Sequence, residues 1–438
     1  MTDRLLQSTD TLPLTVDDLS PRVRLLKPSA TLAINERSAE LIKQGKPVYR
    51  LGLGQSPFPV PNFMVKSLQK YAHKKDYLPV KGLFQLREAV VQRLKRNEGI
   101  EWSPHNVLIG PGSKELIFMV QMAFQGELIL PSPSWVSYAP QSQLAGGETT
   151  WLTTCESESY KLSAQQLDNL CKETTHQRRL LILNSPNNPT GACYSEEELH
   201  NLATVFRKYQ ILVISDEIYS DTHFKGEHVS LARFYPEGTI VSDGISKWAG
   251  AGGWRLGFMC FPDQLSWLVE AMASMASETF TSVSAPIQYA AISGVNESPQ
   301  MTIYLAHCRQ LLSKLAEYSE QQLSQAGISV NKAQGGFYLF PSFEPLRSTL
   351  EQQGIFTGSD LAYRLLNDCG VATLSGLHFG LNDQELILRL ALVDFNGEKA
   401  LNALETTNLP YTIDELFLRT YCPRVINAIK AICEWIQS

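Results

Sequence analysis

The chain has 438 residues, of which 44% are hydrophobic and 19% charged, and its formal net charge at pH 7 is −6. This length suits two domains, or one large α/β body with a sizeable core. The acidic balance argues against nucleic acid or an anionic membrane surface as a partner, because both call for a basic stripe on the protein.

The N-terminal residues MTDRLLQSTDTLPLTVDD are acidic and polar where a signal peptide would need an apolar run, and no segment offers about 20 consecutive apolar residues for a membrane span. The eight cysteines form no Cys-x-x-Cys pair and have no zinc-like spacing with histidine, which favours reduced thiols and no metal site. We therefore expect a soluble cytoplasmic protein with neither a nucleic-acid nor a membrane partner.

Short apolar runs recur between residues 106 and 262, each followed by turn residues and a helical pattern. They predict buried strands at NVLI (106–109), ELIL (127–130), LLIL (180–183), ILVI (211–214), TIVS (239–242) and GFMCF (257–261). Ser195 and Glu198 form a capping box that predicts the start of one intervening helix. This alternation is typical of an α/β fold with a mainly parallel sheet, in which ligands bind beyond the carboxyl ends of the strands.

The last third of the chain changes character. A helix at about 300–325, a strand-like ISV, GGFYLFP, a helix at LAYRLLNDCG and a strand at ELILRLALV predict a smaller α+β domain. Residues 342–358 have the loosest pattern. The final helix, PRVINAIKAICEWIQS, opens with proline and has one apolar face, for which core packing is the default explanation and a partner groove the alternative.

Polar motifs follow four of the predicted strands. GPGSKE is a glycine-rich turn that opens a helix, and it is either a phosphate site or an ordinary structural turn. NSPNNPTGA is a rigid polar loop or a simple turn. SDEIYSD would place Asp216 and Tyr219 at one cavity, although an aspartate at a strand end is more often a cap or a surface charge. The fourth motif is SDGISKWAGAGGWRLGF.

Lys247 in this fourth motif lies among small and apolar residues. Burial lowers the pKa of a lysine and leaves the neutral amine, which attacks carbonyls and forms Schiff bases, including with pyridoxal phosphate. That cofactor needs a phosphate cradle, a carboxylate for its pyridine nitrogen and a group against its ring. The chain offers candidates for all three: Gly112, Ser113, Lys114 and Arg255 for the cradle, Asp216 for the nitrogen and Trp135 for the ring face.

In this order and at these separations, NSPNNPTG, DEIYSD, SKWAGAGGWRLGF and a late ILRLAL segment resemble the class I aminotransferases, the pyridoxal-phosphate enzymes of the aspartate aminotransferase family. The resemblance begins at LKPSATLAINERSAELIKQGKPVYRLGLGQSPFP, includes YLPVKGLFQLREAV and runs to about residue 396. It implies fold type I of the pyridoxal-phosphate enzymes, with a mainly parallel seven-stranded sheet. The implied parts are residues 20–55 and 306–438 for the small α+β domain and 56–305 for the large cofactor-binding domain.

The resemblance also implies a role for each matching residue. Lys247 would form the Schiff base with pyridoxal 5'-phosphate and move the proton, Asp216 would keep the pyridine nitrogen protonated, and Tyr219 and Asn188 would contact the phenolic oxygen. The phosphate would be held by Ser113, the backbone of Lys114, Ser246 and Arg255. The substrate α-carboxylate would be clamped by Arg389, beside Gly54 and Asn188, with Trp135 stacked on the ring.

Tyr77 matches the family tyrosine that reaches the phosphate in the neighbouring subunit, which implies a homodimer with shared active sites; the alternative is an ordinary buried tyrosine. The chain departs from the family pattern at Gly244, where many members carry serine, and in SGLHFG, where Ser375 replaces proline and His378 faces either substrate or the loop. GELILP lacks the usual Gly-Asp, and the tail beyond residue 400 is long.

We therefore expect an aminotransferase that moves the amino group of an L-amino acid to a 2-oxo acid in ping-pong half-reactions. Two alternatives stay open: a pyridoxal-phosphate lyase or an enzyme like aminocyclopropane-carboxylate synthase on the same fold, and a non-catalytic regulator, for which no DNA-binding domain fits before LKPSATLAINE. The substrate is not selected. Trp135, Tyr138 and Phe280 could accept a large apolar side chain or be core, and no second cation stands out for a distal carboxylate.

Overall fold

The computed structural model describes residues 15–24, 26, 30–174, 178–405 and 413–437. These ranges leave out residues 1–14, which belong to the N-terminal segment MTDRLLQSTDTLPLTVDD, and residues 27–29, which belong to LKPSATLAINE. They also leave out residues 406–412 and 438 of the expected C-terminal domain. Within the described ranges, no helix is long and apolar enough to cross a membrane, and no group of His, Cys, Asp or Glu is arranged to hold a metal ion.

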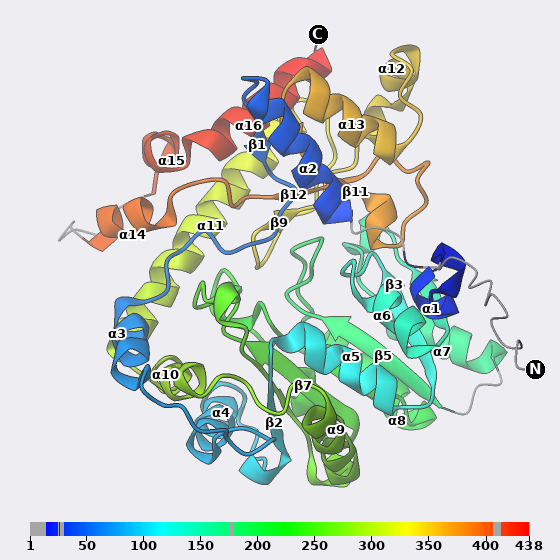
Figure 1. The fold of residues 1–438 in the computed structure, drawn as a ribbon. Coiled ribbons are helices and arrows are strands. Elements are labelled where there is room, and N and C mark those ends of the chain that lie inside the picture. Colours follow the sequence, from blue (N-terminus) through cyan, green and yellow to red (C-terminus); the bar gives the residue numbers. More distant parts are fainter. Residues whose placement is uncertain (1–14, 25, 27–29, 175–177, 406–412, 438) are drawn as a thin grey trace, which may run out of the picture.

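A seven-stranded sheet forms the centre of the larger part of the molecule (Figure 1). Its strands, in spatial order, are β2 (Val107–Gly110), β8 (Gly257–Cys260), β7 (Thr239–Gly244), β6 (Leu212–Asp216), β5 (Arg179–Asn184), β3 (Glu127–Ser132) and β4 (Thr149–Thr153). β8 runs antiparallel to both of its neighbours, and the other six strands all point in one direction. The predicted fold class is therefore confirmed. The edge strand β4 was not foreseen because its TTWLT residues are only partly buried and carry no continuous apolar run.

Side chains alternate along the central strands, so each face of the sheet has its own apolar core. Leu180 and Ile182 pack on one face and Leu181 and Leu183 on the other. The first face is covered by α5 (Ser113–Ala123), α6 (Tyr138–Ala145) and α9 (Ser266–Glu278). The second is covered by α7 (Ala164–Glu173), α8 (Glu196–Tyr209), α4 (Phe84–Glu98), α10 (Ala285–Val295) and α11 (Pro299–Gln325).

The predicted helix start at Ser195 is confirmed by a capping box. Ser195 Oγ accepts a hydrogen bond from the Glu198 backbone N–H at 3.2 Å, and the Glu198 carboxylate accepts one from the Ser195 N–H at 2.8 Å.

At the carboxyl ends of the central strands, Asn184 of β5 lies level with Asp216 of β6, which lies level with Ser242 of β7. The polar loops that follow these strands therefore converge on one place.

A smaller body follows α11 at the carboxyl side of the sheet (Figure 1). It holds a three-stranded antiparallel sheet of β11 (Leu374–Ser375), β12 (Leu388–Ala391) and β9 (Tyr338–Leu339). β1 (Tyr49–Arg50) pairs in parallel with β10 (Val371–Ala372), so an N-terminal segment joins the C-terminal third. This pairing agrees with the predicted division of the chain, whose domain bounds stay a prediction.

Of the remaining helices, the first and the third along the chain pack against the larger part, at α6 and α10, and the others surround the smaller body. In chain order, these remaining helices are α1 (Pro21–Arg24), α2 (Ala30–Lys43), α3 (Asn62–Tyr71), α12 (Arg347–Gln352), α13 (Gly358–Asp368), α14 (Gly397–Glu405), α15 (Glu415–Tyr421) and α16 (Pro423–Gln437). The expectation of a loose stretch at 342–358 was wrong, because α12 forms there. The apolar face of α16 is core: Val425, Ala428, Ile429 and Ile432 are buried.

Candidate active site

The polar loops at the carboxyl ends of the strands enclose a cavity of about 610 Å³. Every predicted site residue except Tyr77 lines it: Gly54, Ser113, Lys114, Trp135, Asn188, Asp216, Tyr219, Ser246, Lys247, Arg255 and Arg389. The cavity walls also contain residues that the sequence did not single out for it, among them Leu53, Gln55, Val136, Asn184, Ile218 and Tyr338. Segments that are far apart in the chain thus meet where the α/β topology places a ligand.

Lys247 follows β7 and directs its amine into the cavity. Its Nζ donates a hydrogen bond to the backbone oxygen of Gly54 at 2.6 Å and lies 5.6 Å from the centres of the Tyr219 and Phe337 rings. Burial lowers the pKa of Lys247 to about 8, and the positive charge of Arg389 adds to this effect, whereas Asp216 opposes it. About a tenth of this amine is therefore neutral and nucleophilic at pH 7, far more than for an ordinary exposed lysine.

Asp216 is the last residue of β6 and is almost fully buried. The Tyr138 hydroxyl donates to Asp216 Oδ2 at 2.5 Å, and Asn184 Nδ2 donates to the Asp216 backbone oxygen at 2.8 Å. Burial raises the pKa of this carboxyl to about 6, although the hydrogen bond from Tyr138 works against the rise. The sequence did not reveal this contact, because it joins residues 78 positions apart in the chain.

Tyr219, Tyr338 and Asn188 form a polar chain along another wall of the cavity. The hydroxyls of Tyr219 and Tyr338 are 2.8 Å apart, and Asn188 Nδ2 donates to the Tyr338 hydroxyl at 3.4 Å. The predicted pair Tyr219 and Asn188 is thus connected through Tyr338, which lies 119 residues beyond Tyr219 and carried no local signal. A Cβ on Gly54 would collide with the Tyr338 hydroxyl, so this approach requires glycine.

Arg389 of β12 is a buried cation, with 4% of its surface exposed. Its Nη1 donates to Asn188 Oδ1 at 3.2 Å and its Nη2 to the Gly52 backbone oxygen at 2.5 Å, and the guanidinium lies 4.8 Å from the centre of the Tyr338 ring. Its Nε has no hydrogen-bond partner, and no carboxylate of the described residues forms an ion pair with it. Burial lowers the pKa of Arg389. A buried guanidinium in this state is suited to receive an anion.

A second anion cradle lies at the start of α5. Gly112 precedes Ser113 with φ +97°, and an added Cβ would collide with the guanidinium of Arg255. Arg255 is held there by hydrogen bonds to the backbone oxygens of Pro111 and Gly252, each at 3.0 Å. The free N–H groups of the helix start and this guanidinium therefore face the same space.

The side chain of Lys114 has a place that the sequence did not reveal. The family resemblance implied a role for its backbone only, and no cation stood out for a distal carboxylate. The Lys114 ammonium nevertheless lines the cavity, 5.0 Å from the centre of the Trp135 ring. Lost hydration lowers the pKa of Lys114, and the charge of Arg255 lowers it further. The cavity is thus lined by the Lys114 ammonium in addition to Lys247, Arg255 and Arg389.

Three other predicted features lie away from the cavity wall. Tyr77 is 90% exposed, so the alternative of an ordinary buried tyrosine is wrong. At Gly244 a Cβ would meet the Gly257 Cα at 2.9 Å, so a serine there would push β7 and β8 apart. Phe280 packs against the core on the α5 and α9 face.

The SGLHFG segment forms a tight turn rather than a lining loop. Ser375 Oγ accepts a hydrogen bond from the Leu377 N–H at 3.2 Å, and His378 is exposed on this turn. Phe379 is buried, with its ring 5.0 Å from the guanidinium of Arg389. The turn therefore supports Arg389 from behind.

Comparison with known proteins bears on what this cavity does. The sequence profile of the family described as aminotransferase class I and II matches residues 46–405. The chain belongs to this family. An aspartate aminotransferase of Bacillus sp. (strain YM-2) is 34% identical over 374 residues, 83% of this chain and 92% of the relative. The aspartate/prephenate aminotransferase of Thermus thermophilus is 30% identical over 366 residues, 82% and 91% of the two chains.

The solved structures agree with this family membership. The aspartate aminotransferase of Thermus thermophilus with maleate has a TM-score of 0.80 and 27% identity, and the match covers 95% of this chain and 99% of that one. The resemblance inferred from the motifs is therefore confirmed, as is amino-group transfer between an amino acid and a 2-oxo acid. The protein is a transaminase, and its family implies pyridoxal phosphate as the cofactor.

Proposed function

We propose that the cavity binds pyridoxal 5'-phosphate at Lys247 and transfers the amino group of a dicarboxylic L-amino acid, aspartate in the first place, to a 2-oxo acid. The observation that carries this proposal is the buried Arg389, which has no carboxylate partner among the described residues and shares its cavity with Lys247. A buried guanidinium with no carboxylate partner in the described ranges is suited to the α-carboxylate of an amino acid.

The groups around the cavity fit the cofactor. Ser113, the backbone of Lys114, Ser246 and Arg255 would hold its phosphate, and this fit rests on the cradle that a Cβ at Gly112 would fill. Asp216 would face the pyridine nitrogen and Trp135 the ring. When bound, pyridoxal phosphate supplies an electron sink for the carbanion at the α-carbon of the amino acid.

The remaining steps belong to side chains of this protein. The neutral amine of Lys247 would take the proton from the α-carbon of the substrate and pass it to the cofactor. The carboxylate of Asp216, which Tyr138 orients through its 2.5 Å hydrogen bond, would keep a proton on the pyridine nitrogen. The Tyr219 hydroxyl and Asn188 would donate to the phenolic oxygen, while Arg389 would hold the α-carboxylate in place.

Lys114 would select the dicarboxylic side chain. The cations that line the cavity are Lys114, Lys247, Arg255 and Arg389, and the last three already have the roles given above. The ammonium of Lys114 forms no ion pair within the described part of the chain, so it is free to meet a second carboxylate. The names of the two curated relatives, aspartate and aspartate/prephenate aminotransferase, support this choice.

A comparison of amino donors with Lys114→Met tests the substrate. We expect kcat/KM for aspartate to fall about 10²-fold in this variant and kcat/KM for phenylalanine to change much less, because only aspartate loses a charge partner. Lys161→Met, which lies outside the cavity, serves as the control. An equal loss with both donors would show that Lys114 acts on the cofactor and not on the substrate side chain.

We further propose a cytoplasmic homodimer in which Tyr77 completes the partner's site. The 90% exposure of this side chain supports the proposal. Mixing Tyr77→Phe protein with Lys247→Ala protein should give more activity than either variant alone. In a mixed dimer, one of the two shared sites would contain both an intact Lys247 and an intact Tyr77. Equal activity before and after mixing, with a monomeric mass in solution, would contradict it.

A further inference from the structure

A buried arginine lies behind the catalytic loops and outside the cavity. Arg93 on α4 is 11% exposed in its side chain, and its ion-pair partner Asp221 is 12% exposed. The same guanidinium lies 4.8 Å from the centre of the Trp248 ring. Asp221 comes two residues after Tyr219, and Trp248 comes directly after Lys247. We propose that Arg93 is a positioning residue that holds the Tyr219 turn and the Lys247 loop in a fixed relation.

The Asp221 end of this link is rigid. Residues Ser220–Thr222 form a 3-10 turn that starts from Tyr219. The backbone N–H and the hydroxyl of Thr222 both donate to the Tyr219 backbone oxygen, at 2.9 and 2.7 Å. Because Asp221 lies inside this turn, a pull on its carboxylate is transmitted to the backbone of Tyr219.

The Trp248 end depends on ring contacts. Trp248 is 1% exposed, and its indole N–H is buried without an acceptor in the described ranges. The loop beyond it folds back tightly, since the Gly250 N–H donates to the Lys247 backbone oxygen at 3.3 Å. Trp248 is therefore placed by packing and by the guanidinium of Arg93, and its place sets that of Lys247.

The surroundings of Arg93 indicate that its charge is used. A cavity of about 230 Å³ adjoins it, lined by Glu98, Glu217, Asp221, His228 and Asp243 among others. Close apolar packing on that side therefore does not hold the guanidinium in place. Burial lowers the pKa of Arg93, and Asp243 opposes this shift. An apolar side chain of similar size would avoid the desolvation of a charge, so what arginine adds here is a planar group bound at two ends.

The inference rests on the roles proposed for Tyr219 and Lys247. Its consequence is that loss of Arg93 lowers the rate of the chemical step more than the binding of substrate. Arg389 and Lys114, which would bind the substrate, lie on β12 and α5 and make no contact with Arg93 in the interactions described above. A shift between the groups that handle the proton therefore lowers kcat and leaves KM nearly unchanged.

The test compares Arg93→Met with Arg87→Met in the holoenzyme. Arg87 is an equally buried arginine of the same helix, but it donates to the backbone oxygens of Gly82 and Pro104, at 3.2 and 2.8 Å. We expect Arg93→Met to lose about 10²-fold in kcat with KM within about threefold. Arg87→Met should lose thermal stability and keep kcat within about twofold.

A spectroscopic readout separates positioning from general destabilisation. The pH midpoint of the absorbance of the bound cofactor should shift in Arg93→Met and Asp221→Asn, and stay in place in Arg87→Met. The double variant Arg93→Met with Asp221→Asn should be no slower than the worse single variant, because both remove one interaction. If Arg93→Met does not fold, Arg93→Lys and Asp221→Asn are measured, and the same shift is expected.

The positioning role of Arg93 and the proposed roles of the site residues fail on different results. If the Arg93 and Arg87 variants lose only stability, with the same kcat and the same midpoint as the wild type, the positioning role is refuted. If Lys247→Ala remains fully active, the proposed site roles fail instead, whatever the Arg93 variants do.

Discussion

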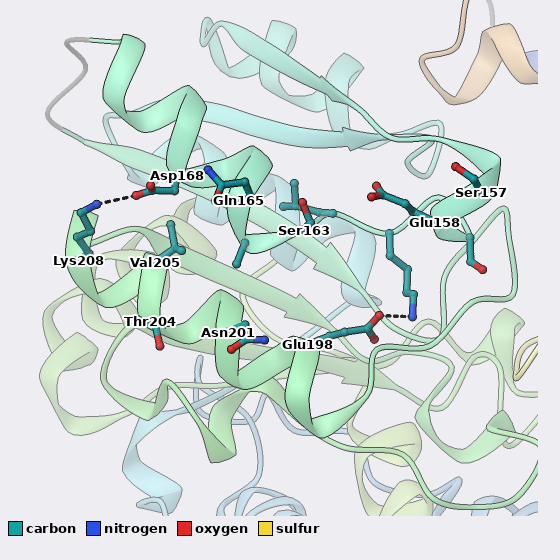
Figure 2. A pocket seen from close by; sticks show the side chains of 14 residues that line it. Ser157, Glu158, Ser163, Gln165, Asp168, Glu198, Asn201, Thr204, Val205 and Lys208 are labelled. Carbon is teal, nitrogen blue, oxygen red and sulfur yellow. Dashed lines mark hydrogen bonds and ion pairs between the residues drawn. The ribbon is translucent and has the colours of Figure 1, made fainter.

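Two hollows of the molecule differ in how their charges are partnered. The wider one, of about 870 Å³, lies between α7 and α8, and its lysines are paired. Lys161 pairs with Glu198, and Figure 2 shows the pair of Lys208 with Asp168. The narrower one, of about 610 Å³, holds Arg389, which has no carboxylate partner among the described residues. A buried charge without a carboxylate partner therefore marks the site better than cavity volume does.

The same contrast explains what each hollow can tolerate. In the α7–α8 hollow, paired charges lie near water, where an ion pair adds little to stability and its loss is inexpensive. In the strand-end cavity, burial lowers the pKa values of Lys247, Lys114 and Arg389. Changes there should therefore alter both the chemistry and the stability of the folded chain.

The largest effect is expected for Lys247→Ala. Loss of the amine removes both the bond to the cofactor and the group that moves the proton, so kcat should fall by at least about 10⁴-fold. The rate of oxaloacetate formation from aspartate measures this loss of kcat, and circular dichroism verifies the fold. Retention of more than a small fraction of the wild-type rate would place the reactive amine elsewhere.

Arg389→Lys comes next. Lysine keeps the positive charge but lacks the planar pair of donors, so KM for the amino acid should rise about 10²-fold, with a smaller change in kcat. Steady-state kinetics with aspartate measures both constants. An unchanged KM would mean that the α-carboxylate binds at another cation of the cavity.

A stability measurement tests the buried lysine without any reaction. The pKa of Lys247 is lowered from 10.5 to about 8 in the folded chain, so between these values the unfolded chain binds more protons than the folded one. The cofactor-free wild type should therefore gain stability relative to Lys247→Met as pH rises through this window, by up to roughly 3 kcal/mol. Urea unfolding of both proteins at pH 7.5 and 9.5 measures the difference. A pH-independent difference would show that the amine is well hydrated.

The site itself was predictable to different degrees. Asp216 ends β6 and Lys247 follows β7, and the convergence of strand ends in an α/β sheet was enough to place both. Arg389 lies on β12 of the smaller body, so only the family resemblance pointed to it. Tyr338 and Arg93 could not be found, because their contacts join segments that only tertiary packing brings together. The direction of the Lys114 side chain was equally hidden, since a motif specifies a residue but not the way its long side chain points.

The fold shows the same limit. Strands with continuous apolar runs, such as β5 and β6, were predicted because both faces are buried. β4 was missed because it lies at the sheet edge and alternates between partly buried and exposed residues. α12 was missed because its six residues, RSTLEQ, offer only Leu350 to the core.

The smallest effect is expected for Lys161→Met in the α7–α8 hollow. Its partner Glu198 also accepts the backbone N–H of Ser195 in the capping box, so it keeps a hydrogen bond when Lys161 is lost. The free energy of unfolding should fall by no more than about 1 kcal/mol, and kcat and KM should stay at wild-type values. Thermal unfolding and aspartate kinetics measure the two. A loss of activity comparable to that of Arg389→Lys would mean that the wider hollow takes part in function, and that paired charges do not distinguish an idle surface from a site.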